Sequence, residues 1–193
     1  MAVSSFSNSG IKAGVKRNKF WDQSAVENSF FSIATTTATG STADVTFSNI
    51  PQTYTHLQLR MMIKNHTANT NNTRIQFNSD TAANYSWHEL YGDSASAGSS
   101  ASTSASYMYL GNHPSNVAAS AFAVFVVDIL DYKDTNKFKT VRTLSGFDLN
   151  GSGVVGLKSG NWRSTSAIST IRIFPGADSF GQYSSFALYG IKG

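Results

Sequence analysis

Cysteine is absent from this chain of 193 residues. Without cysteine, neither a disulfide framework nor a thiolate metal site can form. The absence fits folding in a reducing cytoplasm but does not demonstrate it. The length is sufficient for one domain with a sizeable core, since a β-sandwich of about 200 residues is routinely a single unit.

Charged residues and long apolar runs are also scarce. Charged residues make up 13% of the chain, about half of the roughly 25% that is usual in soluble proteins. No stretch approaches the roughly 18 continuous apolar residues of a membrane span. The first twenty residues lack the apolar centre of a signal peptide. We therefore expect a soluble protein with no export signal and no membrane partner.

The formal net charge of +4 is concentrated at the N-terminus. Four basic residues and no acidic residue occur before Trp21, whereas eleven basic residues balance eleven acidic ones from Trp21 onward. Four cations would give a salt slope of only roughly −3 to −4 on duplex DNA. We therefore do not expect nucleic acid to be a partner.

Residues 1–28 show neither the period of a strand nor that of a helix, and we interpret them as an extended basic arm before a domain at 29–193. A free tail is the alternative. Fully extended, 25 residues span about 80 Å, well beyond the roughly 16 Å radius of gyration of a domain of this size. The arm can therefore reach a neighbouring molecule. Its candidate attachment residues are Lys12, Lys16, Arg17, Lys19, Phe20 and Trp21.

The segment 118–132 is apolar in both of its alternating sets. The two sets are Phe122, Val124, Val126 and Leu130, and Phe125, Val127 and Ile129. This pattern predicts a strand that is buried on both faces. A helix is the rival interpretation, but β-branched and aromatic residues dominate the segment and turn-forming residues precede it. We expect a central strand.

The rest of the chain predicts about ten or eleven short strands and no helix. Residues 54–64 alternate, with Leu57, Leu59, Met61 and Ile63 on one face, and they are expected to form a hairpin with the strand at Ile75 and Phe77. Residues 93–106 are a Ser/Ala/Gly segment that predicts a loop. The fold class expected is an all-β, antiparallel β-sandwich, jelly-roll or lectin-like.

No catalytic or metal-binding pattern is present. The four histidines are scattered, and no Gly-x-Ser-x-Gly elbow occurs. Asp128 and Asp131 would point to opposite faces of one strand, so they do not form a glycosidase pair. Lys133, Lys137 and Lys139 indicate surface ion pairs with this acidic cluster. We expect no enzyme activity, no metal and no cofactor.

Six aromatic residues are candidates for contact with a glycan or a partner protein. They are Tyr85, Trp87, Tyr91, Tyr107, Tyr109 and Trp162. Such rings can stack on sugars, but core packing and subunit interfaces also collect them.

Four segments resemble a family of small virion proteins of tailed bacteriophages, which includes capsid decoration, head-fibre and tail-associated proteins. The segments are IPQTYTHLQLRM (50–61), IQFNSDTAANYSWHELYG (75–92), FVVDILDYKDTNKFKTVRTLSG (125–146) and QYSSFALYGIKG (182–193). The resemblance covers residues 43–193, and the pattern Ser-x-Phe-x-Leu-Tyr-Gly-Ile-Lys is its most specific part. It implies a jelly-roll or lectin-like sandwich, commonly trimeric, without enzymatic activity.

Together these observations predict a homotrimeric capsid decoration or cement protein on the virion surface, made in the host cytoplasm. The arm would fasten it to a capsid or tail protein. The alternative is a receptor- or glycan-binding module of a tail or fibre, with the Ser/Ala segment and the tyrosines at its binding end.

Overall fold

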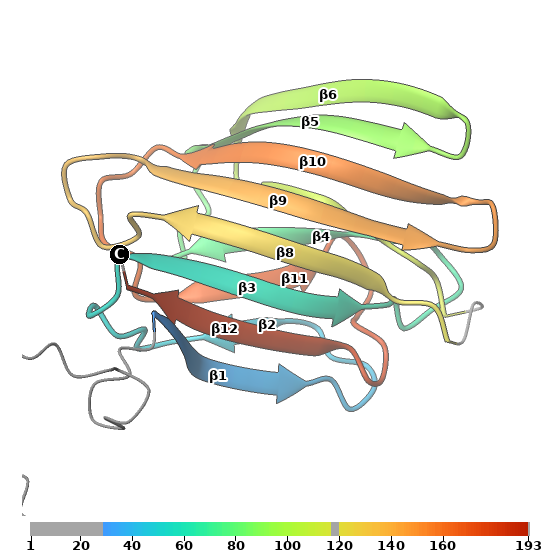
Figure 1. Cartoon of the computed structure of the whole chain (residues 1–193), viewed down its shortest axis with the longest axis horizontal. Coiled ribbons are helices and arrows are strands. Elements are labelled where there is room, and N and C mark those ends of the chain that lie inside the picture. Colours follow the sequence, from blue (N-terminus) through green and yellow to red (C-terminus); the bar gives the residue numbers. More distant parts are fainter. Residues whose placement is uncertain (1–28, 117–119, 193) are drawn as a thin grey trace, which may run out of the picture.

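The computed structural model describes residues 29–116 and 120–192, which form two antiparallel sheets and no helix (Figure 1). The larger sheet contains, in spatial order, β1 (Phe30–Thr37), β12 (Ser185–Ile191), β3 (His56–Ile63), β8 (Ala123–Leu130), β9 (Lys139–Asp148), β10 (Gly153–Trp162), β5 (Tyr85–Asp93) and β6 (Ser96–Ala105). The smaller sheet contains β2 (Val45–Phe47), β11 (Ile171–Pro175), β4 (Asn71–Phe77) and β7 (Met108–His113). The predicted all-β sandwich is confirmed.

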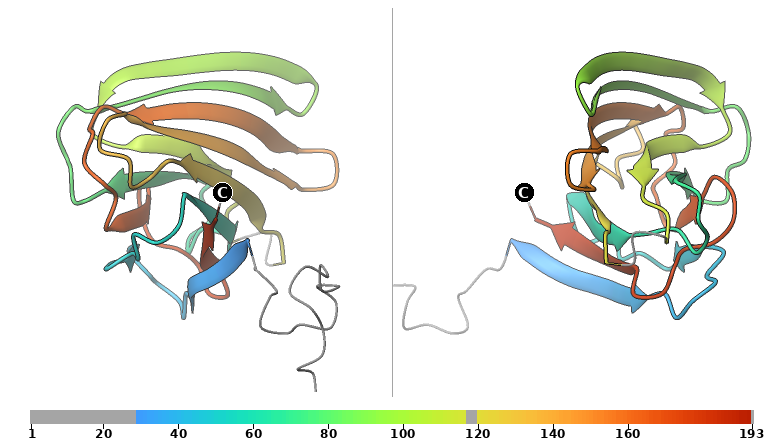
Figure 2. Two further views of the ribbon diagram at one scale, coloured as in Figure 1. Left: turned by 60° about the vertical axis from the view of Figure 1, so that its left-hand side comes forward. Right: turned by 90° about the vertical axis from the view of Figure 1, so that its right-hand side faces the viewer.

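Four of the strands are insertions in a jelly-roll order. Without β5, β6, β9 and β10, the two sheets have the strand orders β1-β12-β3-β8 and β2-β11-β4-β7. If these eight strands are renumbered 1 to 8 along the chain, the orders become 1-8-3-6 and 2-7-4-5. Eight strands in two packed sheets connected in this way form a jelly roll. The inserted hairpins β5–β6 and β9–β10 pair with each other through β5 and β10. They add four strands beside β8 and so widen the larger sheet, which extends past the smaller sheet (Figure 2).

The core lies between the two sheets and follows the alternation of the strands. On β3 the four residues predicted to share a face, from Leu57 to Ile63, are all buried. On β8 the prediction of burial on both faces is wrong within a single chain. Phe125, Val127 and Ile129 are buried, but Val124 and Leu130 are exposed on the opposite side. No second layer of the described chain covers that outer face, because the smaller sheet packs only on the inner one.

Two local predictions are corrected by the strand pairing. Residues 54–64 and 75–77 do not form a hairpin, because β3 lies in the larger sheet and β4 in the smaller one. The Ser/Ala/Gly segment is not a loop: most of it forms the edge strand β6, which pairs with β5 along its length. Its side chains are small and mostly exposed, so the backbone hydrogen bonds to β5 hold it rather than apolar burial.

Of the three lysines predicted to form surface ion pairs in the acidic loop after β8, Lys137 forms them, whereas Lys133 and Lys139 have no ion pair with a described carboxylate. Lys137 pairs with Asp131 and, at 3.4 Å, with Asp134. Lys139 was predicted to lie on the surface but is fully buried. Its Nζ donates hydrogen bonds to the backbone carbonyls of Asp134, Lys137 and Thr165. An ammonium carries three N–H donors, so three carbonyls satisfy it without a carboxylate.

His113 at the end of β7 is a buried titratable group whose Nδ1 lies 3.0 Å from Oγ1 of Thr73. Burial lowers its pKa from 6.5 to about 4, and the charge of Asp178 opposes this shift only in part. Between these pH values the unfolded chain binds a proton that the folded protein does not. The contribution to stability is therefore complete above pH 6.5 and is lost as the pH falls through this window.

We expect the free energy of unfolding to fall by up to about 3 kcal/mol over this window because of His113. Urea denaturation of the wild type and of His113→Gln at pH 7 and pH 4.5 measures this contribution. The variant should lose less stability on acidification than the wild type does. His88→Gln, on the exposed face of β5, is the control and should keep the wild-type pH dependence. An unchanged pH dependence in His113→Gln would contradict the prediction.

Candidate functional site

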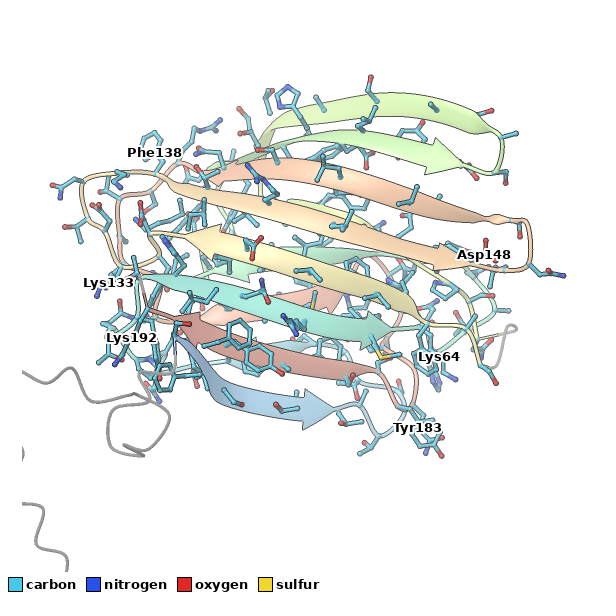
Figure 3. All side chains as sticks on the ribbon, in the orientation of Figure 1. Lys64, Lys133, Phe138, Asp148, Tyr183 and Lys192 are labelled. Atoms are coloured by element: carbon cyan, nitrogen blue, oxygen red, sulfur yellow. The ribbon has the colours of Figure 1, made fainter. Side chains whose placement is uncertain are left out.

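The outer face of the larger sheet is the first candidate surface, and Figure 3 looks directly onto it. Strand register arranges its side chains in rows across the sheet. Two adjacent rows toward the end of the sheet near Asp148 and Lys64 are apolar. Their members are Met62, Leu90, Val124, Val126, Leu144, Val155 and Leu157. We call these residues the apolar half of the outer face.

Most of the apolar half is exposed. Leu90, Leu144 and Val155 have 61%, 56% and 58% of their surface open to solvent. A shallow hollow of about 320 Å³ runs over β5, β9 and β10 among these side chains. Single exposed apolar residues are ordinary, but a contiguous group of this kind marks an interaction surface.

The remainder of the outer face is polar and aromatic. Gln58 donates a hydrogen bond to Asp128 at 2.8 Å and accepts one from Nε of Arg60 at 2.9 Å. The guanidinium of Arg60 lies over the stacked rings of Phe30 and Tyr189. Asp128 is therefore part of a structural network on the sheet surface rather than half of a carboxylate pair.

A cleft under the inserted hairpins is the second candidate site. One face of β5 runs from the core to the rim through Tyr85, Trp87, Glu89, Tyr91 and Asp93. Because the larger sheet extends past β7, the outer part of this face is not covered by the smaller sheet (Figure 2). The result is a cleft of about 340 Å³ between β5, β6, β10 and β7.

An ion pair forms the floor of this cleft. Lys158 on β10 is directly opposite Glu89 on β5, and Nζ lies 3.3 Å from Oε2. Both side chains are at least nine-tenths buried. Nζ also lies 5.0 Å from the centre of the Tyr109 ring. Burial lowers the pKa of Lys158, and the charge of Glu89 opposes that shift. Burial also raises the pKa of the Tyr109 hydroxyl.

Tyrosine rings form the walls of the cleft. The Tyr109 hydroxyl donates to Oδ1 of Asn112 at 2.9 Å, which fixes the ring on β7. Tyr91 lies across the strand from Gly98 of β6, and a Cβ added at Gly98 would approach the Tyr91 ring to 2.6 Å. The Tyr91 ring can therefore occupy this position only because residue 98 is a glycine without a side chain.

Trp87 lies deeper, with its ring centre 5.2 Å from that of Tyr109. Its buried Nε1 has no hydrogen-bond partner among the described residues.

The structure divides the six aromatic candidates into three groups. Tyr91 and Tyr109 line the cleft, and Trp87 lies behind them in contact with Tyr109. Tyr85 and Trp162 are wrongly predicted, because both are buried in the core and their rings stack on each other. Tyr107 is on another face, where it contacts Arg74 and Phe174. The six arm candidates, from Lys12 to Trp21, lie outside the described residues.

Sequence reasoning did not predict Glu89, Lys158 or Asn112 as site residues. The period of two along 85–93 places Glu89 on the same face as Trp87 and Tyr91, which was the available signal. A carboxylate on a face that is otherwise aromatic indicates either a buried pair or a binding group. The partner Lys158 could not be found in this way, because it depends on the register of β5 with β10.

The two carboxylates of the cleft do not have the spacing of a glycosidase pair. Glu89 and Asp93 are four residues apart on one strand, a separation of about 13 Å between positions. Glycosidase carboxylates are roughly 5–9.5 Å apart. Among residues 29–116 and 120–192, no three His, Cys, Asp or Glu side chains are grouped to hold a metal ion. Within the same residues there is no helix long and apolar enough to span a membrane.

Comparison of the chain with models of protein families, with curated proteins and with solved structures finds no match. The resemblance to phage virion proteins stays a prediction.

Proposed function

We propose that this chain is a non-enzymatic structural protein of a bacteriophage virion, a capsid decoration or cement protein displayed on the particle surface. In this proposal the sandwich forms a homotrimer through the outer face of its larger sheet, and the arm of residues 1–28 attaches the trimer to a capsid or tail protein. The observation that carries the proposal is the apolar half of the outer face. The sequence resemblance supplies the phage context.

Two neighbouring copies of this chain, related by a threefold axis, are the occupants we assign to the outer face. Eight strands at a spacing of about 4.8 Å and a length of about eight residues give an outer face of roughly 900 Å². A stable interface needs about 800 Å² from each partner. The apolar half would form the centre of such an interface, and the row containing Gln58 and Asp128 would form its polar rim. Closed rotational symmetry satisfies a surface of this kind without open-ended assembly.

The jelly-roll order is compatible with this role but does not carry it. Jelly rolls occur in viral capsid proteins and in lectins, and a fold alone does not define a function. An assembly role uses the apolar half of the outer face, which is exposed in the single chain.

Attachment through the arm is tested by deleting residues 1–28. The sandwich should remain folded, because the twelve strands of the described residues all lie between Phe30 and Ile191. Co-sedimentation with particles that lack the protein should then be lost. Trp21→Ala should release more protein than Lys16→Ala does, because burying a large apolar side chain contributes about 2–3 kcal/mol and an exposed ion pair about 0.2–1 kcal/mol. Three arms in one trimer would multiply the difference.

Circular dichroism of the deletion variant is the control for folding. Normal sedimentation of the folded deletion variant would place the docking surface on the sandwich and refute the role of the arm.

A further inference from the structure

We propose that the cleft under the β5–β6 hairpin is a binding site for a neutral saccharide. This inference goes beyond the structural role proposed above and does not depend on it. It rests on the shape, the charge and the side-chain chemistry of a cleft that the two insertions build on the jelly roll.

The size of the cleft fits one or two sugar rings. Its volume of about 340 Å³ is at the lower end of the roughly 300–1,000 Å³ found for small-molecule sites. Its lining comes from β5, β6, β7 and β10, so the cleft lies beneath the part of the larger sheet that extends past the smaller sheet. A short glycan or the end of a longer one can enter, whereas a folded domain cannot.

The lining combines ring faces with hydrogen-bonding groups of both kinds. Tyr91 and Tyr109 offer aromatic surface, on which the C–H face of a sugar ring can pack. Glu89 and Asp93 accept hydrogen bonds, the hydroxyls of Ser100 and Tyr91 donate and accept them, and Lys158 donates them. Sugar hydroxyls act both as donors and as acceptors, so they need this mixture. An apolar ligand would shield the Asp93 carboxylate from water without offering it a hydrogen bond.

The charge balance of the cleft selects against anions. Two carboxylates, Glu89 and Asp93, face one ammonium, Lys158, which Glu89 already neutralises. A phosphate, a sialic acid or a uronic acid would bring a further negative charge to a site with an excess of one carboxylate. A neutral saccharide meets no such repulsion, and its hydroxyls can bond to the carboxylates directly.

The binding groups are held in place before a ligand arrives. The Lys158–Glu89 pair bridges β10 and β5, the Tyr109 hydroxyl bonds to Asn112, and the Tyr91 ring lies over Gly98. Fixed side chains lower the conformational entropy lost on binding. All of these residues are on the inner side of the sheet, so an interface on the outer face leaves the cleft accessible.

The experiment measures binding of defined sugars to the full-length protein. The neutral probes are glucose, galactose, mannose, N-acetylglucosamine, maltose, cellobiose and lactose, and the acidic probes are glucuronic acid and N-acetylneuraminic acid. Saturation-transfer NMR detects weak binding. Tryptophan fluorescence adds a signal from Trp87, whose ring lies against Tyr109, on top of those from Trp21 and Trp162. We expect at least one neutral probe to bind in the millimolar range or more tightly, with the acidic probes weaker.

Two variants test the location. Tyr91→Ala removes a ring and should weaken binding by about tenfold or more. Gly98→Ala places a methyl group where the end of the Tyr91 ring lies, so it should displace that ring and weaken binding without a comparable loss of stability. Tyr183→Ala removes an exposed ring at a distant turn and is the matched control, with unchanged affinity expected (Figure 3).

Several results would overturn the inference. They are binding of none of the neutral probes, preference for the acidic probes, and affinity that survives in both Tyr91→Ala and Gly98→Ala when urea midpoints show that the variants are folded. The measurement needs no phage particle, so its failure is separate from failure of the attachment test. In that case the Lys158–Glu89 pair would have a purely structural role.

Discussion

Leu144→Arg is expected to convert the assembled protein into monomers while the sandwich stays folded. Leu144 is near the middle of the apolar half, with Val126 and Leu157 as its register partners on either side. It is 56% exposed in the single chain, so an arginine there can extend into solvent in the monomer. In an interface the same guanidinium would be buried without a partner, which costs several kcal/mol.

Analytical ultracentrifugation at micromolar concentration measures the effect. The wild type should sediment with three times the chain mass of 20.8 kDa, and Leu144→Arg with the mass of one chain. Phe138→Arg is the matched control, because Phe138 is 52% exposed but lies in the loop at the opposite end of the sheet (Figure 3). A monomeric wild type, or dissociation by Phe138→Arg alone, would refute the assignment of the outer face.

The sequence predicts individual strands more reliably than it predicts what covers them. The alternation of Leu57, Leu59, Met61 and Ile63 identified the buried face of β3 correctly, because a period of two fixes which residues share a face. On β8 the same rule found two apolar faces and took both as buried. The pattern reports that a face is apolar. It does not report whether the cover comes from this chain or from another molecule.

The inserted hairpins show a second limit. Residues 96–105 have almost no apolar side chains, so no pattern predicts β6. The strand exists because its backbone pairs with β5, a long-range property that single-sequence propensity does not contain. The cleft depends on this pairing and on the register of β5 with β10. For that reason its aromatic residues were predicted in part, whereas its geometry was not.

Lys139 illustrates how tertiary structure overrides residue type. A lysine beside three aspartates predicts a surface ion pair, and Lys137 makes one. Lys139 is two residues further on, at the start of β9, where strand alternation turns its side chain toward the interior. Burial lowers its pKa, and the carboxylates of Asp134 and Asp131 act against that shift. Its Nζ lies 2.9 Å from the carbonyl of Lys137 and 3.1 Å from that of Thr165.

Lys139→Met is therefore expected to lower the free energy of unfolding by about 1–3 kcal/mol, because the part-buried hydrogen bonds from the ammonium to three backbone carbonyls are lost. Methionine matches the length and volume of lysine, so the lost hydrogen bonds rather than a cavity dominate the change. Lys137→Met is the control in the same loop. Its side chain is 57% exposed, and solvent screening makes its ion pairs weak. Urea denaturation at pH 7 compares the two. A loss of stability in Lys139→Met no greater than that in Lys137→Met would mean that water replaces the ammonium at these carbonyls, and that the buried lysine does not hold this end of the sandwich together.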